Sequence, residues 1–282
     1  MSVDLKQVHE KVLKTQVRII AAKAGGSGTI IYSKKNSKNN YSSYALSCHH
    51  VISDAINVKK EWDSKLGREI KKEFRQSVKV EFFDYGNIEY GHRPINYSVD
   101  ADIVAYDQPH DMALLRLRTI KQSSNVAELC SLDDAKKIMI GDRVWACGCA
   151  LLHDPILTNG RITHVGDEID YKDYWMSSAN IIFGNSGGAV FLENGLTFIG
   201  IPSRIDIAGW SAPITHLGYF SPIHRVYQFL NEQTFNFIHD PTHTEDGDAQ
   251  EREKLKREES HRRDQLMPEE REEELEEKST CV

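Results

Sequence analysis

The segment FGNSGGAVF, with Ser186 at its centre, has the residue types that a nucleophilic serine requires. A serine hydroxyl is a weak nucleophile at neutral pH unless a base takes its proton and hydrogen-bond donors stabilise the oxyanion formed by attack on a carbonyl. Gly184 allows a turn in which its own N–H lies beside that of Ser186, and Gly187 and Gly188 leave space next to the hydroxyl. The alternative is a glycine-rich hairpin with an incidental serine. By itself, the segment indicates acyl-transfer chemistry.

Two further segments supply a base and a carboxylate. SCHHVI places His50 at the end of an apolar strand, and DMALLRL places Asp111 at the start of another, 61 residues later, with Ser186 a further 75 residues on. In a Ser-His-Asp triad the imidazole takes the serine proton and returns it to the leaving amine, while the carboxylate orients the imidazole. His49 is the alternative base. We favour His50, because His49 would point to the opposite face of a strand.

Short apolar or alternating runs, broken by turns, extend from about residue 17 to 221 and must hold these three residues in place. Such runs, rich in Val, Ile, Phe and Tyr, predict an all-β architecture of barrels rather than βαβ units, and the length favours two barrels over one. We expect short helices at residues 4–15 and 223–232. Residues 59–75, with seven basic and four acidic side chains, are interpreted as a solvated helical insertion. A flap that contacts substrate or a partner is the alternative.

The motifs around these residues resemble those of the trypsin-like, chymotrypsin-fold serine endopeptidases, most closely the Deg/HtrA type. GSGTII resembles the opening GSGF-like strand of that family, SCHHVI its T-x-A-H-V segment, DMALLRL its D-x-A-[LV]-L-[KR] strand and GNSGGAVF its GNSGGP-[LV] loop. The resemblance covers about residues 17–232. It implies two Greek-key β-barrels of the chymotrypsin type, with short flanking helices and a charged C-terminal tail. The expected units are an N-terminal helix at 1–16, a protease domain at 17–235 whose two barrels meet near 120–135, and a charged helical or disordered tail at 236–282.

The resemblance also implies a role for each residue. His50 corresponds to the general base, Asp111 to its orienting carboxylate and Ser186 to the nucleophile. The N–H groups of Gly184 and Ser186 correspond to the oxyanion hole. The expected activity is that of a serine endopeptidase, which hydrolyses peptide bonds of a polypeptide substrate through an acyl-enzyme. The alternative is a catalytically silent protease-fold scaffold that binds a partner protein, and an intact triad argues against it.

In the resembling enzymes a primary specificity pocket lies beside the nucleophile. Here its base would be Asn180, six residues before Ser186, and its walls would be Ser203, Arg204, Ile205 and Gly218. No carboxylate lies at the predicted base. A buried Arg or Lys of a substrate would lack a counter-charge, and burying an unpaired charge costs roughly several kcal/mol of binding free energy. We therefore expect cleavage after small to medium apolar residues and poor cleavage after basic ones.

Two motifs in the sequence are also compatible with other kinds of site. GNSGG also satisfies the G-x-S-x-G motif of α/β-hydrolases, but that motif needs a helix after the serine, and AVFLENGLTFIGI predicts a hairpin. Cys147 and Cys149 share a strand face, as two metal ligands would. No second pair of cysteines and no nearby His-x-His completes a four-ligand set, so buried thiols are the preferred interpretation. We expect no metal and no cofactor.

The composition argues against a transmembrane or a secreted protein. No apolar run in the 282 residues approaches the ~18 that span a bilayer, and the first residues lack the apolar core of a secretion signal. Five cysteines at no framework-like spacing, and Val51 where many extracellular relatives have a cysteine, favour reduced thiols and a cytoplasmic location. Asn185 replaces the aspartate of secreted relatives, so activation by N-terminal cleavage is not expected.

Charge is concentrated near the C-terminus. Residues 245–278 contain 15 acidic and 8 basic side chains, which leaves 27 of each sign elsewhere. A neutral main body offers no footprint for nucleic acid, and no segment indicates a membrane partner. Because the tail has too few apolar side chains to bury a core, we expect that removing residues 245–282 leaves folding almost unchanged. The acidic excess favours a role in recruiting a protein partner.

Overall fold

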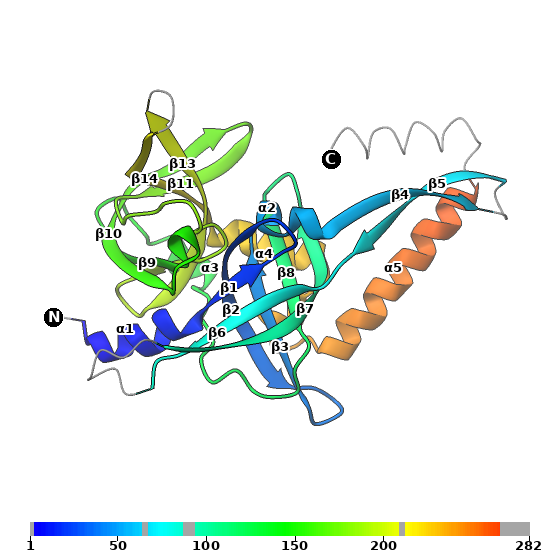
Figure 1. Cartoon of the computed structure of the whole chain (residues 1–282), viewed down its shortest axis with the longest axis horizontal. Helices are drawn as coiled ribbons and strands as arrows, with labels where there is room; N and C mark the ends of the chain where they lie inside the picture. Colours follow the sequence, from blue (N-terminus) through cyan, green and yellow to red (C-terminus); the bar gives the residue numbers. More distant parts are fainter. Residues whose placement is uncertain (1–2, 64–66, 87–93, 209–211, 266–282) are drawn as a thin grey trace.

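The computed structural model describes residues 3–63, 67–86, 94–208 and 212–265, and these form two β-barrels that contact each other (Figure 1). The first barrel has the closed strand order β1-β2-β3-β8-β7-β6, and the second has the closed order β10-β11-β14-β13-β12-β9. The strands of the first are β1 (Gln16–Ile20), β2 (Gly25–Lys35), β3 (Tyr41–Ser47), β6 (Val78–Asp84), β7 (Ile95–Asp107) and β8 (Met112–Leu117). The strands of the second are β9 (Arg143–Gly148), β10 (Ile156–Ile169), β11 (Lys172–Ser177), β12 (Ala189–Leu192), β13 (Thr197–Ala208) and β14 (Ala212–Pro222).

Alternating burial along the strands shows why the chain closes into barrels. In β6, Val78 and Val80 are buried while Lys79 between them is exposed, as expected for a strand with one face on a core. The inward side chains of both barrels belong to one continuous apolar core. Neighbouring strands in each barrel pair antiparallel, and the non-consecutive neighbours β3 and β8 close the first barrel. This arrangement confirms the predicted all-β, chymotrypsin-type double barrel.

Several short helices and one helix of 21 residues flank the barrels. They are α1 (Leu5–Lys11) with η1 (Leu13–Thr15), α2 (His49–Ile52) with η2 (Ser53–Ala55), α3 (Leu132–Ala135), η4 (Ala150–Leu152), α4 (Ile223–Glu232), η5 (Asn236–Ile238) and α5 (Glu245–Gln265). Helix α4 buries Ile223, Val226, Phe229 and Leu230 along one face, which confirms the helix predicted at 223–232. No helix in the described ranges is both long and apolar enough to cross a bilayer.

The segment at 59–75 is not the predicted helix. It is a two-stranded antiparallel sheet, β4 (Ile56–Asp63) paired with β5 (Arg68–Arg75), and this arm extends away from the barrels (Figure 1). Periodicity distinguishes a helix from a strand only when one face of the element is buried and apolar. This charged segment has few buried positions, so its sequence pattern could not distinguish a helix from a hairpin. Pairing of the two strands satisfies the backbone groups in place of helical hydrogen bonds.

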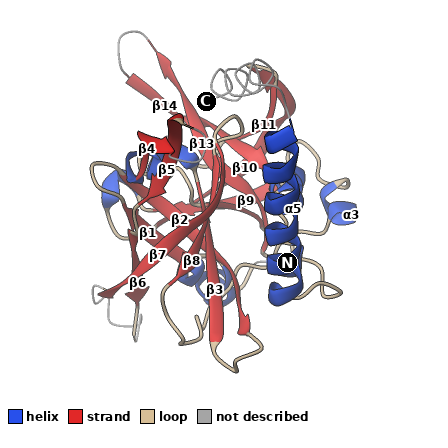
Figure 2. Ribbon diagram, turned by 90° about the vertical axis from the view of Figure 1, so that its right-hand side faces the viewer, coloured by secondary structure: helices blue, strands red, loops and turns tan. Residues whose placement is uncertain are grey.

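Helix α5 forms a second projection, which Figure 2 shows separate from the arm. Its first turns pack against the first barrel. Asp248 is buried and accepts hydrogen bonds from Phe237 N–H (3.0 Å) and from the His243 imidazole (2.7 Å). Glu245 accepts from the Tyr44 hydroxyl at 2.7 Å. Polar contacts therefore anchor the start of this segment where apolar side chains are lacking. The expectation that removing residues 245–282 leaves folding almost unchanged stays a prediction, and these contacts argue against it.

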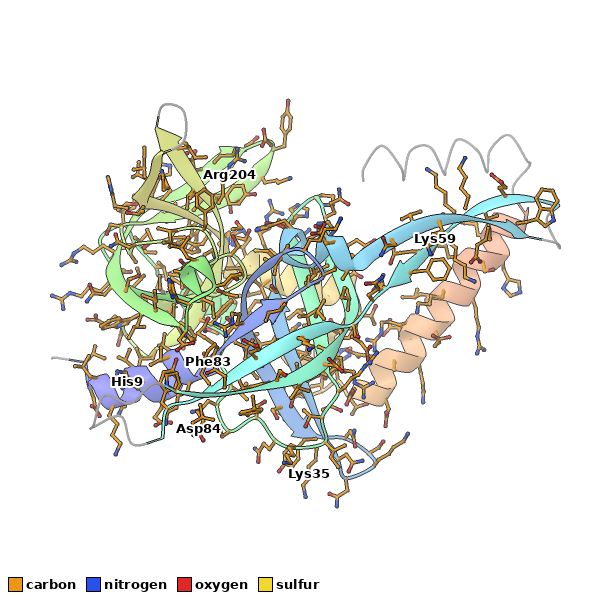
Figure 3. The ribbon with its side chains drawn as sticks, in the orientation of Figure 1. His9, Lys35, Lys59, Phe83, Asp84 and Arg204 are labelled. Atoms are coloured by element: carbon orange, nitrogen blue, oxygen red, sulfur yellow. The ribbon has the colours of Figure 1, made fainter. Side chains whose placement is uncertain are left out.

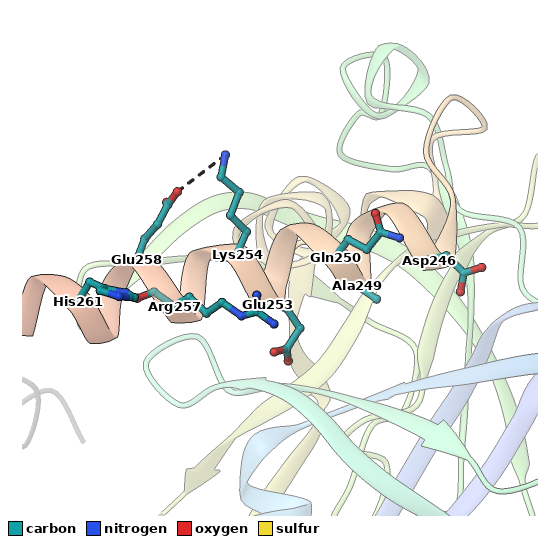
Figure 4. A pocket seen from close by; sticks show the side chains of 8 residues that line it. All are labelled: Asp246, Ala249, Gln250, Glu253, Lys254, Arg257, Glu258 and His261. Carbon is teal, nitrogen blue, oxygen red and sulfur yellow. Dashed lines mark hydrogen bonds and ion pairs between the residues drawn. The ribbon is translucent and has the colours of Figure 1, made fainter. Parts of the chain in front are cut away.

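A hollow of about 740 Å³ lies along one face of α5 (Figure 4). Its lining mixes acidic and basic side chains, and an ion pair joins Lys254 to Glu258 (3.8 Å) within it. None of its lining residues belongs to the predicted triad.

Candidate active site

His50 lies in the short helix α2, directly after strand β3, and not at the end of a strand as predicted. Val51 and Ile52 are buried and hold this single helical turn against the core. The His50 Nδ1 is 2.7 Å from Oδ2 of Asp111, and the His50 backbone N–H donates to Oδ1 of the same carboxylate at 2.9 Å. An ionised carboxylate only accepts hydrogen bonds, so Nδ1 is the donor in this pair, and in the neutral imidazole Nε2 is then the atom that can accept a proton.

Asp111 lies in the turn between β7 and β8. Its backbone φ of +54° is in the left-handed region, which aspartate tolerates better than most residues. The next residue, Met112, is fully buried and begins β8. A short polar side chain in a tight turn, anchored by a core strand, thus presents both carboxylate oxygens to His50.

His49 has different surroundings from His50. Its ring lies 5.1 Å from the ring of Tyr106, and burial lowers the pKa of its imidazole. In the part of the chain that the structure describes, no hydrogen bond joins His49 to Asp111. The prediction placed the two histidines on opposite faces of a strand, which is wrong because both lie in helix α2, where consecutive side chains point about 100° apart. The preferred imidazole is nevertheless the one that contacts Asp111.

Ser186 lies in the turn that precedes β12 and is held against the first barrel. Its carbonyl accepts a hydrogen bond from Ser27 N–H at 2.9 Å. The next residue, Gly187, has φ +84° and packs so closely on Ser27, Ser47 and Cys48 that a side chain there would overlap them. Cys48 is only two residues from His50, so this contact brings the turn that contains Ser186, here called the serine loop, close to helix α2. Among the described residues, no hydrogen bond joins the Ser186 hydroxyl to His50.

The backbone N–H groups of Gly184 and Ser186 meet no acceptor among the residues that the structure describes. Asn185 N–H donates to Ile182 O at 3.0 Å, and Gly184 has φ +91°, which together describe a type II turn. The Phe183 carbonyl accepts from Leu151 N–H at 2.7 Å. Because C=O and N–H of a trans peptide point in opposite directions, the Gly184 N–H points away from Leu151.

The Ser186 N–H is oriented in a similar way. The Asn185 carbonyl accepts from Gly188 N–H at 2.9 Å, so the N–H on the other side of that peptide points away from Gly188. Within the described ranges, neither the Ser186 N–H nor the Gly184 N–H meets an acceptor. Two unpaired donors on one turn are the arrangement that a developing oxyanion requires.

Sequence reasoning missed the groups that hold this turn. The buried Ser27 hydroxyl donates to Gly184 O and accepts from Cys149 N–H, both at 2.6 Å. Leu151 and Leu152, in η4, have φ of +51° and +61°, and Arg18 donates to Leu152 O at 2.7 Å. The first barrel thereby fixes a strained loop of the second, and that loop positions the Phe183–Gly184 peptide. The serine in GSGTII was the available signal, but its partners are distant in the sequence.

Cys48 lies beside the histidine and aspartate. One potential ligand atom on each of Cys48, His50 and Asp111 lies within 4.8 Å of the others. Burial raises the pKa of the Cys48 thiol well above its ordinary value, and its Sγ donates to Pro202 O at 3.4 Å. The thiol is therefore neutral, while His50 and Asp111 are hydrogen-bonded to each other. Cys147 and Cys149 are also buried free thiols, and burial raises the pKa of Cys149 to about 12.

The residues of the predicted specificity pocket lie near one another on the second barrel. Ile205 pairs with Gly218 across β13 and β14, and a side chain at Gly218 would overlap Ile181. Asn180 is exposed, and its carbonyl accepts from Thr158 Oγ1 at 3.1 Å.

The remaining walls are polar in part. Arg204 is exposed and pairs with Asp170 at 3.1 Å. The Ser203 hydroxyl is buried and has no hydrogen-bond partner in the described part of the chain. Asp206 accepts from the Tyr219 hydroxyl at 3.1 Å. The carboxylate nearest in sequence to this wall is thus bound to a tyrosine.

Comparison with solved structures supports the fold. The crystal structure of Deg5 superimposes with a TM-score of 0.54 at 21% sequence identity, covering 79% of this chain and 90% of that one. A structure of the HtrA-type protease AlgW with a tripeptide gives a TM-score of 0.58 at 19% identity, covering 85% of this chain and 65% of that one. No curated protein matches the sequence.

A family model matches much of the sequence. The model of the trypsin-like peptidase domain matches residues 26–201, a range that contains His50, Asp111 and Ser186 and spans both barrels. The match extends over more than half of the 282 residues. The chain therefore belongs to the trypsin-like peptidase family.

Proposed function

We propose that this protein is a serine endopeptidase in which Ser186 attacks the scissile carbonyl, His50 is the general base and Asp111 orients the imidazole. The observation that carries the proposal is the use of both Asp111 oxygens by His50, which leaves Nε2 free to accept a proton. The unpaired N–H groups of Gly184 and Ser186 support the same chemistry, because they can bind the oxyanion.

The proposed reaction runs in two steps. The Ser186 hydroxyl transfers its proton to His50 Nε2 as Oγ bonds to the carbonyl carbon, and the imidazolium then protonates the leaving amine. Water attacks the resulting ester with His50 again as the base, which releases the acid and restores the hydroxyl. Among the described residues the Ser186 hydroxyl and His50 are not hydrogen-bonded to each other, and catalytic hydrogen bonds of this kind often form only when substrate binds.

Cys48 is the competing nucleophile, and its surroundings argue against it. A thiol reacts as the thiolate, whereas burial raises the pKa of Cys48 and keeps its Sγ on Pro202 O.

The proposal also extends to specificity. The close contact between Ile181 and Gly218 supports a shallow apolar pocket, and the bond between Asp206 and Tyr219 leaves that carboxylate occupied. Small to medium apolar side chains would fit this pocket.

A fluorophosphonate probe tests the assignment directly. We expect the probe to label the wild-type protein and the Cys48→Ala variant, but not Ser186→Ala or His50→Ala. Loss of one triad member should lower turnover by about 10⁴-fold or more, and His49→Ala serves as the matched control for His50→Ala. Equal labelling of wild type and His50→Ala would contradict the proposed base. A failure of the correctly folded wild type to react would favour the silent scaffold.

A further inference from the structure

The β4–β5 arm is joined to the candidate active site at its base. Arg75, the last residue of β5, lies over the ring of Tyr106 with its guanidinium carbon 4.9 Å from the ring centre, and the Tyr106 hydroxyl donates to Glu73 at 2.5 Å. The ring of Tyr106 also contacts the ring of His49, the residue before His50. A continuous line of contacts therefore leads from the arm to the histidine that binds Asp111.

Lysines oppose each other in two successive pairs across the arm. Lys59 faces Lys72, and Lys60 faces Lys71 (Figure 3 labels Lys59). Like charges directly opposite in a sheet are unfavourable, and an isolated two-stranded sheet is only marginally stable. Lys72 is neutralised by Glu61 at 3.2 Å, whereas Lys60 and Lys71 have no carboxylate partner among the described residues.

The unpaired lysines share a face of the arm with apolar side chains. Because side chains alternate along a strand and paired residues share a face, one face carries Val58, Lys60, Trp62, Glu69, Lys71 and Glu73, and we name it the Lys60 face. Val58 and Trp62 are 57% and 68% exposed. Glu73 is bound by Tyr106 and by Arg75, so Glu69 is the remaining acid on this face. The result is an exposed lysine pair flanked by an aromatic and an aliphatic side chain.

We propose that the Lys60 face is an exosite that binds an acidic stretch of a polypeptide substrate, with an apolar residue of that stretch on Trp62 or Val58. This proposal rests on the proposed endopeptidase function. Carboxylates bridging Lys60 and Lys71 would remove the like-charge repulsion between them. Because the base of the arm contacts Tyr106 and Tyr106 contacts His49, a chain bound on the arm would lie close to the candidate active site. The glutamates that lie between the lysines of the arm would repel the continuous row of phosphates of a nucleic acid more than the separate carboxylates of a peptide.

Binding is tested on full-length Ser186→Ala protein with a fluorescent Glu-rich peptide that contains one leucine. We expect the Lys60→Ser/Lys71→Ser double variant to weaken binding about tenfold, and added salt to weaken wild-type binding as screening predicts. The matched control is Lys35→Ser/Lys121→Ser, which removes two exposed lysines near the far end of the β2–β3 hairpin (Figure 3 labels Lys35). It should change binding by less than about twofold.

Cleavage is tested with two long substrates that share one scissile sequence and differ only in an acidic stretch. The stretch should raise kcat/KM about tenfold in wild type, and the arm variant should lose that gain while cleaving a short peptide normally. An equal gain in both proteins would overturn the exosite. If the wild type cleaves neither substrate, the endopeptidase proposal fails, while the binding measurement on Ser186→Ala still decides whether the Lys60 face holds acidic peptides.

Two other occupants would give different results. An oligonucleotide that binds as tightly as the peptide, with the same loss in the arm variant, would overturn the assignment to polypeptide. The other occupant is the chain's own acidic segment, residues 269–277. If the peptide bound only after the glutamates of this segment were changed to glutamine, the segment itself would be the occupant, and the assignment to a substrate would be overturned.

Discussion

The substitution Ser27→Ala tests whether hydrogen bonds between the two barrels support catalysis, because it changes such bonds without changing a triad side chain. The Ser27 hydroxyl is fully buried and joins Gly184 O in the serine loop to Cys149 N–H at the start of the η4 loop, both at 2.6 Å. Alanine removes both hydrogen bonds and leaves the partly buried Gly184 carbonyl and the buried Cys149 N–H without these partners. The substitution touches no atom of His50, Asp111 or Ser186.

The structure sets the size of the two expected effects. Each lost hydrogen bond that leaves a buried group unpaired destabilises a fold by about 1–3 kcal/mol, so the loss of two should lower the free energy of unfolding by about 2–6 kcal/mol. Complete loss of one oxyanion donor lowers kcat by about 10²–10³. The Phe183 carbonyl would still be held by Leu151 in the variant, so we expect a smaller fall of about 10- to 100-fold, with KM little changed.

The assay compares Ser27→Ala with Ser33→Ala, a matched change on the same strand. Ser33 is also buried, and its hydroxyl contacts Ser43 Oγ at 2.8 Å and accepts from Ser123 N–H at 2.9 Å. Both variants should lose similar stability in thermal or urea unfolding, but only Ser27→Ala should lower kcat toward a short peptide, measured well below the melting temperature. Equal kcat values in the two folded variants would refute the idea that Ser27 positions the oxyanion turn.

Two further predictions concern the docked helix and the specificity pocket. The hydrogen bond to Asp248 raises the pKa of His243 above its ordinary value of 6.5, so the pair stabilises the fold fully below about pH 6.5, and this contribution is lost as the pH rises through the higher, folded-state value. The difference in Tm between wild type and His243→Gln should therefore shrink from pH 6 to pH 8, and a pH-independent difference would contradict the ion pair. In a peptide-library digest, small to medium apolar residues should dominate before the cleaved bond, because the Asp206 carboxylate accepts from Tyr219; a majority of Arg or Lys there would show that this carboxylate serves the pocket.

Local sequence was sufficient for the double barrel and for the choice of candidate residues. Alternation of apolar and polar residues is a property of neighbouring positions, so strands such as β6 could be recognised without their partners. The residues around Ser186 were similarly informative, because a turn with a positive φ at Gly184 and close packing at Gly187 both demand glycine. The contact between His50 and Asp111 agrees with their expected order in the chain, and the catalytic roles of all three residues stay a prediction.

Contacts between distant segments decided the rest. A charged segment such as the β4–β5 arm satisfies its backbone equally well as a helix or a hairpin, and the contact of Arg75 with Tyr106, 31 positions away, lies outside any local pattern. Helix α5 is held by Asp248, a buried polar residue that composition alone assigns to solvent. The sequence by itself determined which residue types could carry out acyl transfer and which strands form the barrels. Only the tertiary structure decided how Ser27 and Leu151 hold the oxyanion turn, because those hydrogen bonds join backbone groups, whose partners are set by packing and not by residue type.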